Sequence, residues 1–366
     1  MPRALAMTPA AAAAPLLAVD RLRVEFPTRH GTLIAVHDVS FDIAPGEVLG
    51  VVGESGAGKS LTGAAVIGLL EPPGRITGGE VRLDGQRIDN APPEQIRKIH
   101  DARIDTLPAE AMRKVRGKRI GMVFQDPLTS LNPLYRIGDQ LVETIRTHTD
   151  ISAADARRRA VALLQEAGIQ GAEARLDSYP HEFSGGMRQR VVLALALCAE
   201  PDLVIADEPT TALDVSIQAQ IIALLKRLCR ERGTAVLLIT HDMGVIAEMA
   251  DRVAVMYAGR IVEVGPVRDV VLSPHHPYTR GLMGAIPPVA ARVPRLTQIP
   301  GSMPRLTAVP AGCAFHPRCA HTFDRCTRER PERLVVAAST EAACWLYAEP
   351  RVEPAEPTGA GAGVAT

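Results

Sequence analysis

The stretch Gly53-Glu54-Ser55-Gly56-Ala57-Gly58-Lys59-Ser60 fits the pattern G-x-x-x-x-G-K-[ST] of a phosphate-binding loop. It follows the apolar run 48–52 and precedes a helix-like stretch from Lys59 to about Leu70. Glycines let backbone N–H groups turn inward around phosphate oxygens, and a helix N-terminus favours an anion. We expect Lys59 to reach the β- and γ-phosphates and Ser60 to ligate Mg²⁺. The nucleotide-binding segment extends one residue further, to Leu61. The sequence therefore predicts a nucleotide-binding site that also holds Mg²⁺.

A pair of carboxylates at the end of another apolar run forms the second part of the predicted site. The run 203–206 reads as a buried strand that leads directly into Asp207 and Glu208. A carboxylate at this edge of a sheet can hold the Mg²⁺ shell, which is the role we expect for Asp207. Glu208 can polarise the attacking water as a general base. The alternative is an ordinary strand that ends in a solvated acidic pair.

Composition narrows the class of protein. The chain has 366 residues, of which 46% are apolar and 22% charged, so most of it can form a packed core. Lys+Arg and Asp+Glu both number 41, and aromatic residues make up 3%, which argues against nucleic-acid binding. The longest apolar run, 191–199, is far shorter than the roughly 20 residues that span a bilayer.

Strands that alternate with helices predict an α/β domain with a mostly parallel sheet. We place this domain at residues 16–265, with a helical subdomain at about 127–190, and a smaller cysteine-containing domain at 266–348. Residues 1–15 are expected to be a disordered leader, with an export signal as the alternative, and 349–366 a disordered tail. A short repeat, 94–99 and 110–115, indicates either two similar helical turns or a chance match.

Ser184-Gly185-Gly186-Met187, just before a helical stretch, narrows the class further. The sequence here resembles the ATP-binding cassette (ABC) family, whose signature is a Leu-Ser-Gly-Gly-Gln type loop. It departs from that signature at Phe183 and Met187, and neither change removes the phosphate-contacting groups. The motifs also occur in the order of that family: the P-loop, Gln125, the signature, Asp207-Glu208, Asp214 and His241.

The resemblance implies how these residues act. Two ATPase domains would form a head-to-tail sandwich, in which Ser184, Gly185 and Gly186 contact the γ-phosphate of ATP on the partner's P-loop. Gln125 would sense Mg²⁺ and the attacking water, His241 would contact the γ-phosphate, and Asp214 would organise the seam between the domains. Phe26 is the candidate for stacking on adenine, with core packing as the alternative.

Further stretches resemble one branch, the oligopeptide/dipeptide importers, a group that includes nickel and glutathione importers. They are the segments 124–133, 179–183, 206–215, 273–279 and 312–319. The resemblance implies the ATP-hydrolysing D-type subunit on the cytoplasmic face of the inner membrane. Its partners would be a related second ATPase, two membrane permeases and an extracytoplasmic substrate-binding protein. A soluble ABC ATPase of DNA repair or translation, and a metal-regulated ATPase, are the alternatives.

Four of the six cysteines fall close together, with the spacing C-x5-C-x6-C-x17-C. In a reducing compartment such a set suits an iron–sulfur cluster, and members of this importer group carry the same arrangement. Zinc and four unmetallated, packed thiols are the alternatives, and His316 or His321 would be able to replace one ligand. Cys198 and Cys229 are expected to be packed in the core. The candidate metal ligands are Cys313, Cys319, Cys326 and Cys344.

Overall fold

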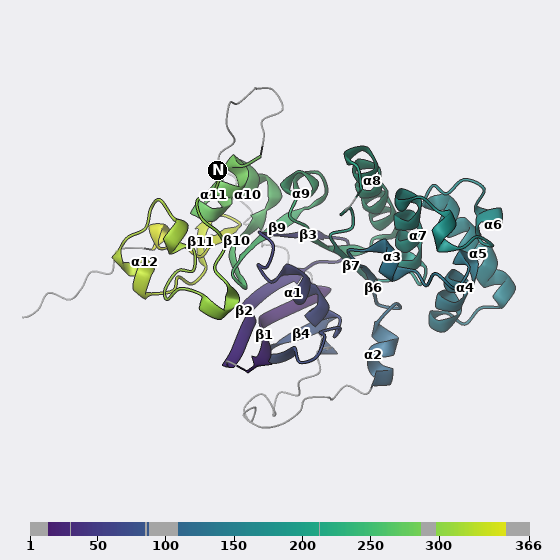
Figure 1. Cartoon of the computed structure of the whole chain (residues 1–366), viewed down its shortest axis with the longest axis horizontal. Coiled ribbons are helices and arrows are strands. Elements are labelled where there is room, and N and C mark those ends of the chain that lie inside the picture. Colours follow the sequence, from purple (N-terminus) through teal and green to yellow (C-terminus); the bar gives the residue numbers. More distant parts are fainter. Residues whose placement is uncertain are drawn as a thin grey trace, which may run out of the picture.

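The architecture is that of an α/β protein, as the sequence predicts, and the described residues form two sheets, of which the smaller was not predicted (Figure 1). The computed structural model describes residues 14–29, 31–84, 86–87, 109–211, 213–286 and 298–348. The expectations for the leader before residue 14, for the tail from 349 and for the repeat copy at 94–99 lie outside the described residues. The second copy falls on helix α2 (Ala109–Val115).

The larger sheet has eight strands in the order β11-β12-β10-β9-β3-β8-β7-β6, and β9 through β6 run parallel. Every residue of β3, β7 and β8 is buried, because helices or the second sheet cover both faces. This confirms the strands expected from the apolar runs. The parallel strands are β9 (Arg252–Tyr257), β3 (Val48–Val52), β8 (Ala235–Ile239), β7 (Leu203–Asp207) and β6 (Ile120–Val123).

The smaller sheet is antiparallel, with the order β2-β1-β4-β5. Its apolar face and helix α1 (Lys59–Val66) pack against one face of the large sheet. The side chains of Leu49 and Val51, on β3, point toward this face. Val48 and Val52 point to the opposite face, so the parallel strands divide the core into two clusters. The strands of the small sheet are β2 (Gly31–Ile43), β1 (Leu17–Thr28), β4 (Arg75–Leu83) and β5 (Gln86–Arg87).

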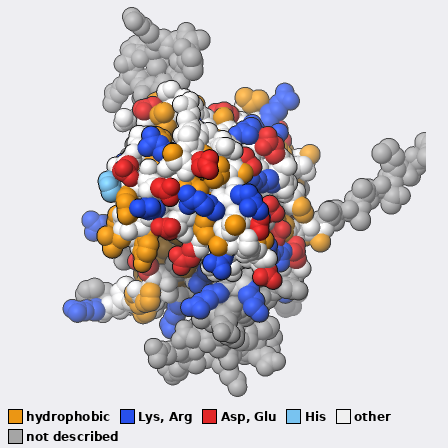
Figure 2. Space-filling model, turned by 90° about the vertical axis from the view of Figure 1, so that its right-hand side faces the viewer, with side chains coloured by type: hydrophobic (Ala, Val, Ile, Leu, Met, Phe, Trp, Pro, Cys, Tyr) orange, Lys and Arg blue, Asp and Glu red, His pale blue; other side chains and the backbone are white. Residues whose placement is uncertain are grey.

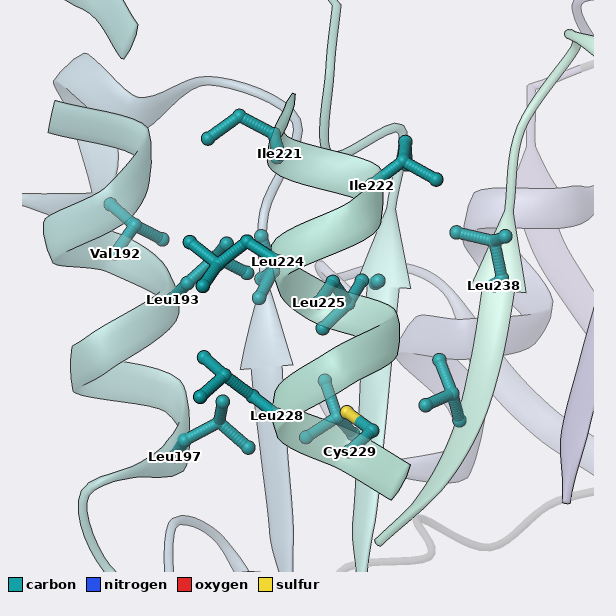
Figure 3. Close-up of a cluster of buried hydrophobic side chains, with 14 of the residues drawn as sticks. Val192, Leu193, Leu197, Ile221, Ile222, Leu224, Leu225, Leu228, Cys229 and Leu238 are labelled. Carbon is teal, nitrogen blue, oxygen red and sulfur yellow. The ribbon is translucent and has the colours of Figure 1, made fainter. Parts of the chain in front are cut away.

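Helices gather at the β6 end of the large sheet (Figure 1). Figure 3 shows α7 beside α8, with Leu193, Leu225 and Leu238 filling the space between them and β8. Figure 2 shows basic and acidic side chains interspersed on this end of the molecule, without a field of one sign. These helices are α3 (Pro127–Ser130), α4 (Ile137–His148), α5 (Ala153–Glu166), α6 (Ala172–Arg175), α7 (Gly185–Leu197) and α8 (Val215–Arg232). Helix α9 (Met243–Met249) lies nearer the middle of the sheet, against β3 (Figure 1).

The C-terminal region lies at the opposite end and extends the same sheet (Figure 1). β10 pairs with β12, and Phe315 and Tyr278 share one buried cluster with Tyr257 of β9. The boundary at residue 265 stays a prediction. None of the helices in the described ranges is both long and apolar enough to cross a bilayer. The elements are β10 (Arg260–Pro266), α10 (Val267–Leu272), α11 (Pro277–Gly284), α12 (Asp324–Arg328), β11 (Leu334–Ala337) and β12 (Thr340–Ala342).

Candidate functional site: a nucleotide-binding edge of the sheet

The predicted phosphate loop connects the end of β3 to the start of α1. Two of its glycines are required by geometry. Gly53 has φ +154°, and a Cβ there would come within 2.2 Å of the Met256 carbonyl oxygen. Gly58 has φ +100°, and a Cβ there would lie 2.9 Å from the Ala35 carbonyl oxygen. A side chain at either position would force the loop away from these strands, so the two glycines keep the loop close against β9 and β2.

Lys59 is buried under the loop, and its Nζ donates to the carbonyl oxygens of Gly53, at 2.8 Å, and Glu54, at 3.1 Å. Burial lowers the pKa of Lys59, although the carboxylates of Glu208 and Asp207 act in the opposite direction. The ammonium group therefore lies close enough to both carboxylates to feel their charge. This arrangement places one buried cation beneath the loop and beside the two carboxylates.

Ser60 and Asp207 meet across the site, where Ser60 Oγ donates to Asp207 Oδ1 at 2.9 Å. Burial and the neighbouring Glu208 raise the pKa of Asp207, against the hydrogen bond from Ser60 and the charge of Lys59. A hydroxyl and a partly desolvated carboxylate are hard oxygen donors of the kind that Mg²⁺ prefers, so the donor set fits this ion. A cation between them would offset the desolvation of Asp207.

Glu208 is the centre of a second group of side chains. Its Oε2 accepts from Gln125 Nε2 at 3.1 Å and from Thr211 Oγ at 2.8 Å, and its Oε1 lies 3.2 Å from His241 Nδ1. The backbone at Glu208 has φ +46°, a left-handed conformation that is uncommon for a residue other than glycine. Three predicted residues, Gln125, Glu208 and His241, are thus brought together, although they are 83 and 33 positions apart.

The surroundings of Glu208 keep it ionised. Burial alone would raise its pKa, but hydrogen bonds from Thr211 and His241 and the charges of His241 and Lys59 outweigh burial and lower the pKa. A carboxylate that is charged at neutral pH and partly buried is suited to accept a proton from water. Thr211 was not predicted from the sequence. Its position three residues after Glu208, across a Pro-containing turn, is the signal that was available.

The predicted signature forms the start of α7 in the helical part of the chain. Ser184 is the N-cap, and its Oγ accepts from the Met187 N–H at 3.3 Å. Asp214 caps α8 in the same way and accepts from Ile217 N–H at 2.9 Å. Gly186 lies close to Ile217, where a Cβ would come within 2.8 Å of the Ile217 side chain. Among the described residues, no hydrogen bond or ion pair joins Ser184, Gly185, Gly186 or Asp214 to the P-loop of the same chain.

Phe26 lies on β1 opposite Leu33 of β2. Its ring packs against Gly74, where an added Cβ would come within 2.5 Å of a ring carbon, and against the core cluster on that side. Leu33, in contrast, lines a hollow beside Glu54, Ser55 and Gly56 of the P-loop. The adenine contact of Phe26 stays a prediction.

The four C-terminal cysteines line one cavity of about 20 Å³ together with His316 and His321. Burial raises the pKa of Cys313 to about 11, and it also raises the pKa of Cys319 and Cys344. Across the described ranges, however, no three His, Cys, Asp or Glu side chains are placed to hold a metal ion. The geometry therefore does not support the predicted iron–sulfur cluster or zinc ion. Cys198 and Cys229 are buried in the core, as expected.

Two family descriptions match the chain. "ABC transporter" matches residues 36–211, and "Oligopeptide/dipeptide transporter, C-terminal region" matches residues 262–326. The structure titled "Dimeric structure of a post-hydrolysis state of the ATP-binding cassette MJ0796 bound to ADP and Pi" shares 27% identity and a TM-score of 0.58. The similarity covers 69% of this chain and 99% of that chain.

Curated relatives resemble the chain over most of its length. The oligopeptide transport ATP-binding protein OppD of Salmonella typhimurium is 46% identical over 316 residues, 86% of this chain and 89% of the relative. The dipeptide transport ATP-binding protein DppD of Bacillus subtilis is 44% identical over 332 residues, 90% of this chain and 94% of the relative.

The P-loop at the end of buried strand β3, the carboxylates at the end of β7 on the far side of β8, and the cassette fold define an ABC ATPase. Within that class, the chain belongs to the family of ATP-binding subunits of oligopeptide and dipeptide transporters. This confirms the branch that the sequence resembles. It also favours transport-coupled ATP hydrolysis over the alternatives of DNA repair, translation and metal regulation.

Proposed function

We propose that the chain hydrolyses ATP at the edge of its large sheet to power the uptake of dipeptides or oligopeptides. The observation that carries this proposal is the meeting of Gln125, Glu208 and His241 beside the P-loop, with Glu208 held ionised. Glu208 accepts a proton from the water that attacks the γ-phosphorus. Gln125 orients that water, and His241 contacts the γ-phosphate.

Residues of the P-loop bind the nucleotide in this proposal. Backbone N–H groups of residues 53–61 surround the phosphates, and Lys59 neutralises charge on the β- and γ-phosphates. Ser60, Asp207 and Gln125 would hold Mg²⁺, which supplies charge neutralisation when it is bound. Phe26 would stack on adenine from the end of β1.

The second half of each ATP site comes from another ATPase subunit in this proposal. Ser184 is exposed at the N-terminus of α7, and Asp214 is exposed at the start of α8. Val215, next to Asp214, is apolar and 83% exposed. A partner that covers this edge would bury Val215 and bring its own P-loop to Ser184, Gly185 and Gly186. The arrangement suits the related, distinct ATPase subunit expected from the sequence.

A neighbouring surface suits a membrane permease. Leu134 and Tyr135 are 80% and 56% exposed, and Phe124 is also exposed directly before Gln125. Exposed apolar side chains on one segment are typical of a protein–protein contact. This segment connects Gln125 to the helical part, so it would link the ATP site to the permease. We propose that the chain lies on the cytoplasmic face of the inner membrane, peripheral to two permeases, with a substrate-binding protein on the other side.

Co-purification and transport assays test this proposal together. Tagged chain should bring the second ATPase and both permeases out of detergent-solubilised membranes, and the reconstituted complex should hydrolyse ATP faster when loaded binding protein is added. Replacing both Leu134 and Tyr135 with Ser should release the permeases but leave ATP binding unchanged. A fully active complex after that change would contradict the proposed contact.

We also propose that the four C-terminal cysteines hold iron–sulfur or zinc when metal is supplied. The support is the donor set, since four thiols and the imidazoles of His316 and His321 line one cavity. Iron, acid-labile sulfide and zinc should be measured per chain on protein purified without oxygen. About four iron atoms and four sulfides per chain would support an iron–sulfur cluster. A chain that contains no iron, sulfide or zinc refutes the proposal of a bound metal. The four thiols are then packing residues.

A further inference from the structure

The C-terminal region contacts the outer side of the P-loop at three points. Arg318 forms an ion pair with the Glu54 carboxylate through two hydrogen bonds, of 2.9 and 3.0 Å. The Tyr278 hydroxyl accepts from the Glu54 N–H at 2.9 Å. Met303 lies over Gly56, with its Cε 3.0 Å from the point that a Cβ would occupy. All three contacts fall on Glu54–Gly56, the part of the loop before Lys59.

Arg318 is itself held firmly. Its side chain is only 7% exposed, and its Nε donates to the Pro300 carbonyl oxygen at 2.8 Å. The guanidinium lies over the rings of Tyr257 and Phe315, 5.8 and 5.9 Å from their centroids. The planar fork of an arginine matches a carboxylate in a way that lysine does not. The position of Glu54 is therefore fixed by a group that cannot easily move.

Tyr278 completes this support from a different element. It lies in the first turn of α11, is fully buried, and packs against Tyr257 with ring centroids 4.6 Å apart. Phe315 contacts both tyrosine rings. Arg318 and Tyr278 thus both bind Glu54. Both also pack against the same aromatic rings, those of Tyr257 and Phe315, where β9 meets the C-terminal region.

We infer that Arg318 is a positioning residue for ATP binding, through which the C-terminal region holds the P-loop in its binding conformation before the nucleotide arrives. This inference rests on the proposed ATP site. A glycine-rich loop loses conformational freedom when it closes around phosphates, and a loop that is already held loses less on binding. Arg318 touches no phosphate, so it acts on affinity through Glu54.

Direct ATP titration of the full-length chain tests the inference. We expect Arg318→Gln to raise the Kd for ATP about tenfold, because a partly buried charge pair is broken and the loop is released. In the assembled transporter KM for ATP should rise similarly, while kcat at saturating ATP stays within about twofold, since Glu208 and its partners are untouched. Arg318→Lys should give a smaller rise in Kd, since it keeps the charge but loses the fork.

Arg325→Gln is the matched control. Arg325 also lies in the C-terminal region, pairs with Glu329 at 2.9 Å and covers the Trp345 ring, but it does not contact the P-loop. Its Kd for ATP should equal that of the wild type. If Arg325→Gln raised the Kd for ATP as much as Arg318→Gln, the inference would be overturned, because a general loss of stability would then explain both results.

Glu54→Gln removes the same ion pair from the P-loop side. It is the replacement test if Arg318→Gln does not fold. It should raise Kd by a similar factor, and the double variant should be little worse than either single one, because both changes remove one interaction. Independent, multiplying effects or an unchanged Kd in both single variants would refute the inference. Lys59→Ala distinguishes a failure of the proposed ATP site from a failure of the inference about Arg318. If Lys59→Ala leaves ATP binding intact, the proposed site itself is wrong, whatever effect Arg318→Gln has.

Discussion

Replacing Glu208 with glutamine isolates the role of its negative charge, because the surrounding hydrogen bonds can all be kept. The carboxylate uses Oε2 to accept from Gln125 and Thr211 and presents Oε1 to His241 Nδ1. In Glu208→Gln, the amide oxygen can take the Oε2 position, and the amide NH2 can donate to Nδ1 of a neutral His241. The variant should therefore fold normally and bind ATP with the wild-type Kd.

The expected loss is in the chemical step alone. Glutamine cannot accept a proton from water, and a general base typically contributes about 10²–10⁴ in rate, which corresponds to about 2.7–5.4 kcal/mol of activation free energy. The Glu208 carboxylate is ionised and can accept a proton, and it lies within hydrogen-bond distance of Gln125 and His241. We therefore expect kcat to fall by about 10²–10⁴ while Kd for ATP changes less than about threefold.

The assay is ATP turnover by the reconstituted transporter with the second ATPase inactivated, together with direct ATP titration of the purified chain. Glu231→Gln is the control, since Glu231 is an exposed carboxylate on α8 that pairs with Arg227 and has no other ion pair among the described residues. It should turn over at the wild-type rate. Undiminished turnover by Glu208→Gln would refute the assignment of Glu208 as the base, and a large rise in Kd would show that it supports nucleotide binding instead.

Two further changes test the loop and the core. Lys59→Ala removes a cation that is buried beneath the P-loop and should raise Kd for ATP about 10–100-fold, the range for a lost charge-assisted hydrogen bond, as measured by titration. An unchanged Kd would contradict the proposed phosphate contact. Leu225→Ala empties part of the cluster between α7, α8 and β8 (Figure 3) and should lower the free energy of unfolding by about 2–5 kcal/mol in urea. Leu69→Ala, at a 38% exposed position, should change it little, and equal losses would contradict the packing argument.

Local pattern was sufficient to predict the parallel strands and the P-loop. Strands buried on both faces must be apolar along their whole length, so β3, β7 and β8 are visible as uninterrupted runs. The residues that follow such strands meet at one edge of the sheet, which is why Lys59 and Asp207 could be assigned to one site before any coordinates. The meeting of Ser60 with Asp207 agrees with that expectation.

Long-range partners could not be predicted in this way. Arg318 and Glu54 are 264 positions apart, and neither residue alone indicates an ion pair. The cysteine spacing predicted a metal centre, but spacing fixes only the order of the thiols, whereas ligation depends on where Cys344 returns from β12 relative to Cys313 and Cys319. The same spacing is compatible with four thiols around a small cavity, which is what the structure contains.

The pattern of exposure around the site fits the proposed pairing with a second ATPase subunit. Glu208 is only 16% exposed, whereas His241 is 64% exposed and Ser184 lies at the surface of another part of the chain. A general base is most effective where bulk water is excluded and the attacking water is oriented. This chain supplies the base and the phosphate loop, but it leaves His241 exposed, and among the described residues no hydrogen bond joins Ser184 to its own P-loop. A second ATPase that covers His241 would exclude water and add a second N-terminal helix dipole at the γ-phosphate in one movement, so closure of the pair and completion of the catalytic site are the same event.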